Sequence, residues 1–164
     1  MIDLLQKKMH NLIVLSFLLL LSCNTKNEPK NNHKLMQNTE ELDAIKKMLK
    51  AQQDYWNNGD IDGFMKSYWN SKELIFTSLN HKSTYGWNKT LERYKESYPT
   101  KESMGKLKFK IINLELISHN TAALKGEWEL IRNKDHPIGV FWLDLRKFEE
   151  NWLITKDSTI SLVN

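Results

Sequence analysis

The chain has 164 residues and a formal net charge of +4, with 24 Lys and Arg against 20 Asp and Glu. Five of the basic residues and two of the acidic ones precede Asn38, which leaves a nearly neutral remainder with 19 and 18. Lysines in that remainder alternate with apolar residues or neighbour Glu and Asp, without the basic stripe and interleaved aromatics that bind nucleic acid. The composition therefore argues against nucleic-acid binding.

The first 22 residues are typical of an export signal. Lys7 and Lys8 precede an apolar run, residues 12–21, which is half of the roughly 20 residues that a membrane-spanning helix needs. The sequence Leu20-Leu21-Ser22-Cys23 resembles the lipobox of bacterial lipoproteins, in which the cysteine is acylated and becomes the mature N-terminus. We expect a protein exported to the bacterial cell envelope, facing the periplasm and anchored to the membrane through lipidated Cys23. The alternative is an ordinary signal peptide followed by a free thiol.

Cys23 is the only cysteine, so no internal disulfide can form and the fold must be held by its core. Residues 24–37 are rich in Asn and Lys and contain Pro29, which predicts a flexible tether from Cys23 to residue 37. A frayed first helical turn at residues 34–37 is the alternative. Residues 38–164 are enough for one domain with a sizeable core.

Three helices are predicted in the first half of this domain. Asn38 or Thr39 can cap the first helix, whose apolar side recurs at steps of three and four residues: Leu42, Ile45, Leu49, Gln52 and Trp56. Asp60 caps a second, shorter helix. The third begins near Trp87 and ends at Pro99.

Strands make up the rest. Residues 74–76 predict a short strand, followed by a loop that carries His81. Apolar alternation over residues 107–111 changes phase at Ile112, which indicates a β-bulge, and residues 121–131, 139–148 and 152–159 predict three more strands. The predicted class is α+β, a cone-shaped curved antiparallel sheet of four long strands plus a short one, wrapped by three N-terminal helices.

Five segments carry a family resemblance: YWNNGDIDGFMKSYW (55–69), YGWNKTLERYKESYP (85–99), GEWELIR (126–132), GVFWLDLRK (139–147) and WLITKDST (152–159). With the order of elements, they resemble the nuclear transport factor 2-like superfamily, the cone fold that includes SnoaL-like cyclases and ketosteroid isomerase. The segments themselves are similar to the bacterial group known as domain of unknown function 4440. The likeness covers essentially all of residues 38–159.

That bacterial group usually closes with Trp-x-Ile-x-x-Asp-His-Thr-Ser. The chain matches it at four positions: Trp152, Ile154, Asp157 and Thr159. Ser158 stands at the histidine and Ile160 at the final serine. Chemistry that needs the imidazole is therefore not expected.

The resemblance implies a pocket enclosed by the sheet and helices. Aromatic side chains with a polar atom suit the wall of a site for a mostly apolar ligand, and the candidates, with Arg132, are Tyr68, Trp69, Phe76, Tyr85, Trp87, Tyr94 and Trp128. Tyr85 and Trp87 flank Gly86 and are expected at the mouth of the pocket. The alternative is that these rings only fill the core.

Arg132 has three interpretations. Strand alternation puts it on the same face as Trp128 and Leu130. It could bind a ligand carboxylate, form a buried pair with Asp157 or Asp144, or lie at the rim with its stem on apolar surface.

Catalysis of the isomerase type needs a carboxylate base and an oxyanion hole formed by a tyrosine and a protonated aspartic acid. The resemblance puts Thr77 at the base and Gln52 at the tyrosine of the hole, and neither can act. Asp54 and Asp157 remain as weak catalytic candidates. The histidines lack metal-site spacing, and no metal or cofactor is expected.

Three functions are compatible with these patterns. The preferred one is binding of a small, largely apolar ligand, because the catalytic candidates fail. A SnoaL-like acid/base enzyme acting on a small organic substrate is the alternative, and it predicts a cavity-facing carboxylate or histidine with a perturbed pKa. A non-catalytic association domain is the third: alternation leaves Trp142 on the outer sheet face, which predicts a homodimer through that face.

Overall fold

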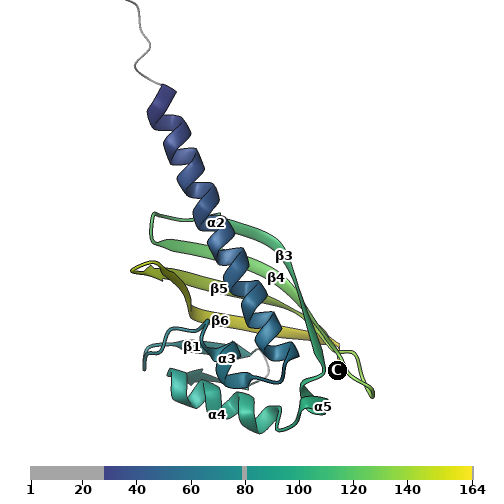
Figure 1. Ribbon diagram of the computed structural model, residues 1–164. Helices are drawn as coiled ribbons and strands as arrows, with labels where there is room; N and C mark the ends of the chain where they lie inside the picture. Colours follow the sequence, from purple (N-terminus) through teal and green to yellow (C-terminus); the bar gives the residue numbers. More distant parts are fainter. Residues whose placement is uncertain (1–27, 79–80, 164) are drawn as a thin grey trace, which may run out of the picture. The chain divides into compact units, whose positions relative to one another are not determined.

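The computed structural model describes residues 28–78 and 81–163 (Figure 1). The predicted signal peptide and the lipidation site at Cys23 lie outside the described residues. The chain divides into two compact units, residues 1–37 and 38–164. None of the helices in the described ranges is both long and apolar enough to cross a membrane.

The first helix, α2, runs Glu28–Asn57. Residues 28–37 are thus helical where a flexible tether was predicted, and the predicted cap at Asn38 or Thr39 is wrong. Pro29 is tolerated because it lies in the first turn, and the Lys, Leu, Met and Gln residues that follow are good helix formers. Leu35 and Met36 are exposed, whereas from Asn38 onward the apolar stripe is buried as predicted, at Ile45, Leu49, Gln52 and Trp56.

The next elements join the helices to the sheet. Helix α3 (Ile61–Met65) is capped as predicted by Asp60, whose Oδ1 accepts a hydrogen bond from the backbone N–H of Gly63 at 2.7 Å. Strands β1 (Ile75–Ser78) and β2 (His81–Tyr85) pair antiparallel, so the predicted loop at His81 is a strand. Helix α4 (Trp87–Ser97) ends before Pro99 as predicted, and a short helix not predicted from the sequence, α5 (Lys101–Met104), follows it.

Four long strands complete the sheet: β3 (Lys106–Leu116), β4 (Thr121–Ile131), β5 (Ile138–Phe148) and β6 (Asn151–Val163). The strand order is β2-β1-β6-β5-β4-β3, and the long strands lie side by side in Figure 1. The α+β prediction is confirmed. The sheet is mixed rather than wholly antiparallel, however, because β1 runs parallel to β6.

Two of the β-bulges in the sheet bear on which side chains face inward. The predicted bulge at Ile112 is present, between Ile111 and Asn113 of β3. A second bulge at Thr155 of β6 was not predicted. Because each bulge reverses the inward and outward alternation, the second one puts Ile154 and Asp157 on the same face.

Helix α2 closes the edge of the sheet at β3. Gln53 Oε1 accepts a hydrogen bond from the backbone N–H of Phe109, and Asn57 Oδ1 accepts one from the backbone N–H of Leu107, both at 2.7 Å. These side chains satisfy donors that an exposed edge strand would leave open to another chain. Between helices and sheet lies the core, which includes Leu107, Leu124, Leu130, Leu143 and Ile154.

Candidate functional site

A cavity of about 490 Å³ lies against the inner face of the sheet, within the size range of small-molecule pockets. Helices α2 and α4 contribute to its wall through Leu49, Gln52, Trp56, Arg93 and Tyr94, and the sheet contributes through residues that include Trp128, Phe141 and Leu143. The interior of the cone is therefore open, with a wall rich in aromatic side chains.

Five of the eight predicted pocket residues lie along this cavity: Tyr68, Phe76, Tyr94, Trp128 and Arg132. Tyr94 is at the centre of the aromatic cluster, with ring centroids 5.1 Å from Phe64 and 5.6 Å from Phe76. The rings fill much of the core and leave a space between them, so the two interpretations of these aromatics both describe part of the structure.

The other three predicted residues do not line the cavity. Trp69 stacks on Phe148 with ring centroids 5.2 Å apart, and Trp87 donates from Nε1 to the carbonyl of Met65 at 3.0 Å. Tyr85 is 59 % exposed. Gly86, at φ 93°, does turn the chain from β2 into α4. The turn leaves Tyr85 in solvent and Trp87 against α3, so the prediction that these two residues form the mouth of the pocket is wrong.

Asp157 forms the polar end of the cavity. Its side chain is buried, and Oδ2 accepts a hydrogen bond from the Tyr68 hydroxyl at 2.7 Å, with the Tyr94 hydroxyl 3.3 Å from that of Tyr68. Within the described residues, Oδ1 of Asp157 is the one buried side-chain polar atom without a hydrogen-bond partner. A buried carboxylate oxygen without a partner is rare in native proteins, and this one belongs to a residue of the cavity wall.

Burial sets the protonation of this group. It raises the pKa of Asp157 from the ordinary 3.8 to about 6, opposed in part by the Tyr68 hydrogen bond. Burial, and then the charge of Asp157, also raise the pKa of Tyr68 and of Tyr94 well above the usual value. Both phenols therefore stay protonated at neutral pH, while Asp157 changes charge near pH 6.

The bulge at Thr155 explains how Asp157 enters the cavity. Thr155 Oγ1 donates to the Asp144 carbonyl at 3.0 Å, and beyond this bulge Asp157, Thr159 and Ser161 line the cavity. Ser158, the position of the missing histidine, pairs instead with Trp142 and alternates to the outer face. Position 158 therefore does not contribute a side chain to the cavity.

Arg132 forms an ion pair, but with neither predicted partner. Its Nε and Nη2 donate to the two carboxylate oxygens of Asp135 at 2.5 and 2.8 Å, and Nη1 donates to the Ser103 carbonyl at 3.2 Å. The β4–β5 turn folds back within three residues, which brings Asp135 closer than the predicted Asp157 or Asp144. Arg132 thus forms a structural pair at the cavity wall, as one of the three interpretations held, but the predicted partners Asp157 and Asp144 are wrong.

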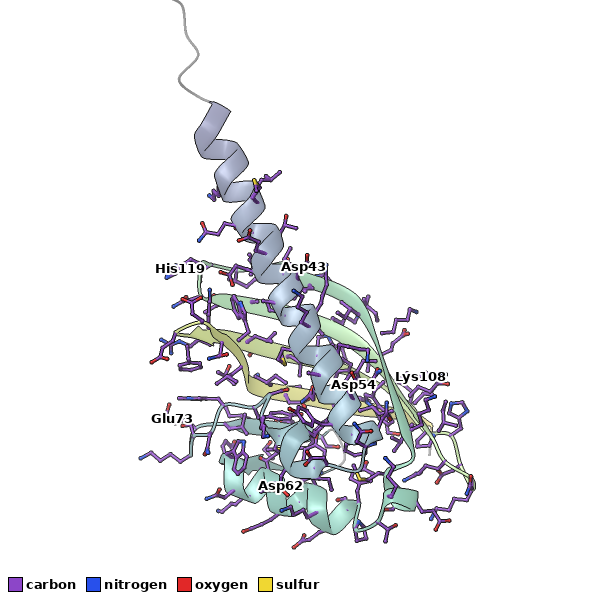
Figure 2. All side chains as sticks on the ribbon, viewed as in Figure 1. Asp43, Asp54, Asp62, Glu73, Lys108 and His119 are labelled. Atoms are coloured by element: carbon purple, nitrogen blue, oxygen red, sulfur yellow. The ribbon has the colours of Figure 1, made fainter. Side chains whose placement is uncertain are left out.

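The isomerase positions do not form a catalytic set. Gln52 lines the cavity and is 1 % exposed, but its amide has no acid function. Thr77 faces away, since its neighbours Phe76 and Ser78 line the cavity. Asp54 lies on the surface of α2 (Figure 2), where it pairs with Lys50. Of the two catalytic candidates, Asp157 alone reaches the cavity.

Sequence reasoning missed Arg93 and Tyr98, which also line the cavity. The carbon of the Arg93 guanidinium lies 5.0 Å from the centroid of Phe76. The signal was present: on α4, Arg93 and Ser97 form one row at a spacing of four, beside the row of Tyr94 and Tyr98.

Two glycines shape the sheet side of the cavity. A Cβ at Gly139 would lie 2.4 Å from the Trp128 ring, and one at Gly126 would lie 2.4 Å from the Phe141 ring. The bare backbone therefore lets both rings lie close to the sheet, where Trp128 Nε1 donates to Thr159 Oγ1 at 2.9 Å. In the described ranges, no three His, Cys, Asp or Glu side chains come together as a metal site.

Similar folds occur among solved structures. A nuclear transport factor 2-like protein of unknown function from Shewanella oneidensis shares 43 % identity, over 72 % of this chain and 97 % of that one, with a TM-score of 0.69. A ketosteroid isomerase-like protein from Erwinia carotovora atroseptica shares 16 %, over 76 % and 98 %, with a TM-score of 0.64. A nuclear transport factor 2-like protein with a cystatin-like fold from Novosphingobium aromaticivorans shares 8 %, over 84 % and 92 %, with a TM-score of 0.66.

The chain belongs to the nuclear transport factor 2-like family, because the first of these relatives combines high identity with nearly complete coverage. The more distant structures show the fold alone. No family model and no curated protein sequence matches the chain, so the narrower assignment to the domain of unknown function 4440 group stays a prediction.

Proposed function

We propose that this protein binds a small, largely apolar ligand in its cone cavity. The observation that carries the proposal is the open, aromatic space of about 490 Å³ with the partnerless Oδ1 of Asp157 in its wall. A plain core would leave neither a space of this size nor a buried carboxylate with an unused oxygen.

The wall limits the chemistry of the ligand. Its surface is supplied mostly by rings and aliphatic side chains such as Phe76, Trp128 and Leu143, which favour an apolar, ring-bearing body. At neutral pH, Asp157 accepts a hydrogen bond from a ligand hydroxyl or amine. Below about pH 6 it holds a proton, which lies on Oδ1 because Oδ2 already accepts from Tyr68, and the group can then donate to a ligand carbonyl.

Native mass spectrometry of the full chain, purified from its own cell envelope, tests the proposal. The expected result is a retained mass that is lost in Ser97→Trp, because Ser97 lines the cavity and a larger side chain there takes up ligand space. Glu96→Trp is the matched control, because Glu96 is the exposed neighbour of Ser97 on α4 and does not line the cavity. Wild-type protein without a retained mass, or equal loss in both variants, would contradict binding in this cavity.

Acid/base catalysis is a second candidate because one observation favours it. Asp157 is a cavity-facing carboxylate with its pKa raised to about 6, which is the feature that an acid/base enzyme requires. A neutral aryl ketone such as 1-acetylnaphthalene in D₂O reports on the chemistry through deuterium incorporation into its methyl group. Catalysis requires faster incorporation with the wild type than with Asp157→Asn; equal rates would exclude this role for Asp157.

Anchoring to the bacterial cell envelope, on its periplasmic side, is part of the proposal. It is supported by the lipobox-like sequence that ends at Cys23, since two or three acyl chains hold a protein firmly at a membrane. Metabolic labelling with an alkyne analogue of palmitate is expected to label the wild type and not Cys23→Ser, which would leave the membrane fraction. Membrane retention of unlabelled Cys23→Ser would contradict the anchor. Membership of the domain of unknown function 4440 group is also proposed, supported by the sequence segments that resemble that group.

We propose also that two copies associate through the outer sheet face. Trp142 is 40 % exposed there, and the exposed Ile138 and Leu162 lie on the neighbouring part of β5 and β6. Exposed apolar side chains grouped on one sheet face are typical of an interface. Such association is compatible with binding or with catalysis.

A further inference from the structure

Arg93 is a cation that faces the cavity from helix α4. Its guanidinium stacks over the Phe76 ring, with 5.0 Å from its central carbon to the ring centroid. Its Nη1 lies 3.4 Å from Thr84 Oγ1, which is a weak hydrogen bond. Among the side chains that the structure describes, no carboxylate lies within ion-pair distance of Arg93.

The other charged side chains at the cavity cannot bind an anion, because each is already paired or is itself negative. Both carboxylate oxygens of Asp135 accept from Arg132, so that pair is neutral overall. Asp157 uses Oδ2 for Tyr68. Lys95, the next cation on α4, forms its ion pair with Asp62, away from the cavity. Arg93 is thus the cation of the described wall that lacks an anionic partner.

We propose that the ligand of this cavity is an apolar organic acid, whose carboxylate or sulfonate binds Arg93 while its apolar body lies against Phe76, Trp128 and Phe141. This inference rests on the proposed ligand-binding function. A guanidinium presents a planar fork of donors that fits two oxygens of such a group. Its stacking on Phe76 holds the fork in place, so little side-chain freedom is lost on binding.

The two unpaired charged groups of the described cavity wall, Arg93 and Asp157, then have different roles. Ionised Asp157 repels a second carboxylate, so the anionic group of the ligand is directed to Arg93. The two charges therefore favour one orientation of the ligand.

Two probes with the same skeleton separate charge from apolar contact: the anionic 1-anilinonaphthalene-8-sulfonate and the neutral N-phenyl-1-naphthylamine. Binding to the full chain is followed by quenching of tryptophan fluorescence, because Trp56 and Trp128 line the cavity. The wild type is expected to bind the anionic probe about tenfold more tightly than the neutral one, the effect of one charged hydrogen-bonded contact.

Three variants identify the source of this preference. Arg93→Gln is expected to abolish the preference by lowering the affinity for the anionic probe alone. Arg93→Lys keeps the charge and is expected to retain part of the preference. Lys95→Gln removes the same charge from the same helix and is expected to bind both probes as the wild type does. Thermal melting of each variant verifies the fold.

The possible outcomes distinguish this inference from the proposed ligand-binding function on which it rests. Equal affinity for the two probes, or a preference that survives Arg93→Gln, would overturn the role of Arg93 and leave an apolar binding cavity in place. Loss of the preference in Lys95→Gln as well would assign it to general charge and overturn the inference. Failure of both probes to bind the wild type would overturn the ligand-binding function and this inference together.

Discussion

Replacing Asp157 with Asn tests the polar end of the cavity through the pH dependence of stability. Native Asp157 keeps its proton up to about pH 6, whereas the unfolded chain releases it near the ordinary value of 3.8. A rise of about 2 pKa units corresponds to ~3 kcal/mol. Because the folded state binds the extra proton, Asp157 makes the wild type lose stability as the pH rises through this window, and its contribution is constant above about pH 6.

The Asp157→Asn variant cannot ionise and lacks this loss. Its free energy of unfolding relative to the wild type is therefore expected to increase by about 2 to 3 kcal/mol between pH 4 and pH 7.5. Other titrating groups cancel in the difference between the two proteins. Urea unfolding of the full chain, measured at five or so pH values across this range, gives that difference directly.

Asp54→Asn is the matched control, because Asp54 is an exposed carboxylate paired with Lys50 on α2. Surface pairs of this kind contribute little to stability, so its difference from the wild type is expected to stay small at every pH. A flat difference for Asp157→Asn across the same range would show that Asp157 titrates as an ordinary carboxyl. The buried, partnerless oxygen would then be absent in solution, and the argument for a polar end of the cavity would fail.

Three further changes test the packing and the proposed interface. Gly139→Ala is expected to cost about 1 to 3 kcal/mol in urea unfolding, since its methyl group would meet the Trp128 ring and neighbouring backbone; unchanged stability would mean that this ring does not lie against the sheet. Glu41→Gln removes an ion pair to Lys147, with Oε1 and Nζ 2.7 Å apart, and is expected to cost about 1 kcal/mol at pH 7. Lys147 lowers the pKa of Glu41, so that cost should vanish as the pH falls through this lowered pKa, and a cost that persists in acid would refute the pairing. Trp142→Glu is expected to give monomers in sedimentation velocity if the outer face associates, whereas an unchanged sedimentation coefficient would exclude that face.

The sequence was sufficient for the parts of the fold that depend on local pattern. The apolar stripe of α2, the Asp60 cap, and the change of phase at Ile112 each follow from spacing along the chain, and the structure confirms them. Strand β2 was missed because residues 81–85 (HKSTY) lack apolar alternation; they form a strand because β1 supplies their hydrogen-bond partners.

For the candidate site, the sequence identified the aromatic character of the wall and five of its residues. It could not separate Tyr94, which faces the cavity, from Trp87, seven residues earlier on the same helix, because both belong to the packing face of α4. Only the packing of the neighbouring elements decides which part of that face borders the cavity. Arg132 shows the same limit: its need for a counter-ion was predictable, but the turn that delivers Asp135 was not.

The class of fold, the long curved strands and an aromatic interior follow from the sequence alone, because these depend on the periodicity and chemical character of the side chains. Tertiary structure decided which polar groups enter the cavity. The bulge at Thr155 turns Asp157 inward, although Trp152, Ile154 and Ile160 in the sequence indicate the opposite face. Helix α4 brings Arg93 over Phe76, and no carboxylate of the described residues forms an ion pair with it. Both outcomes depend on how separate elements pair and pack, and a one-residue change of register would reverse the first.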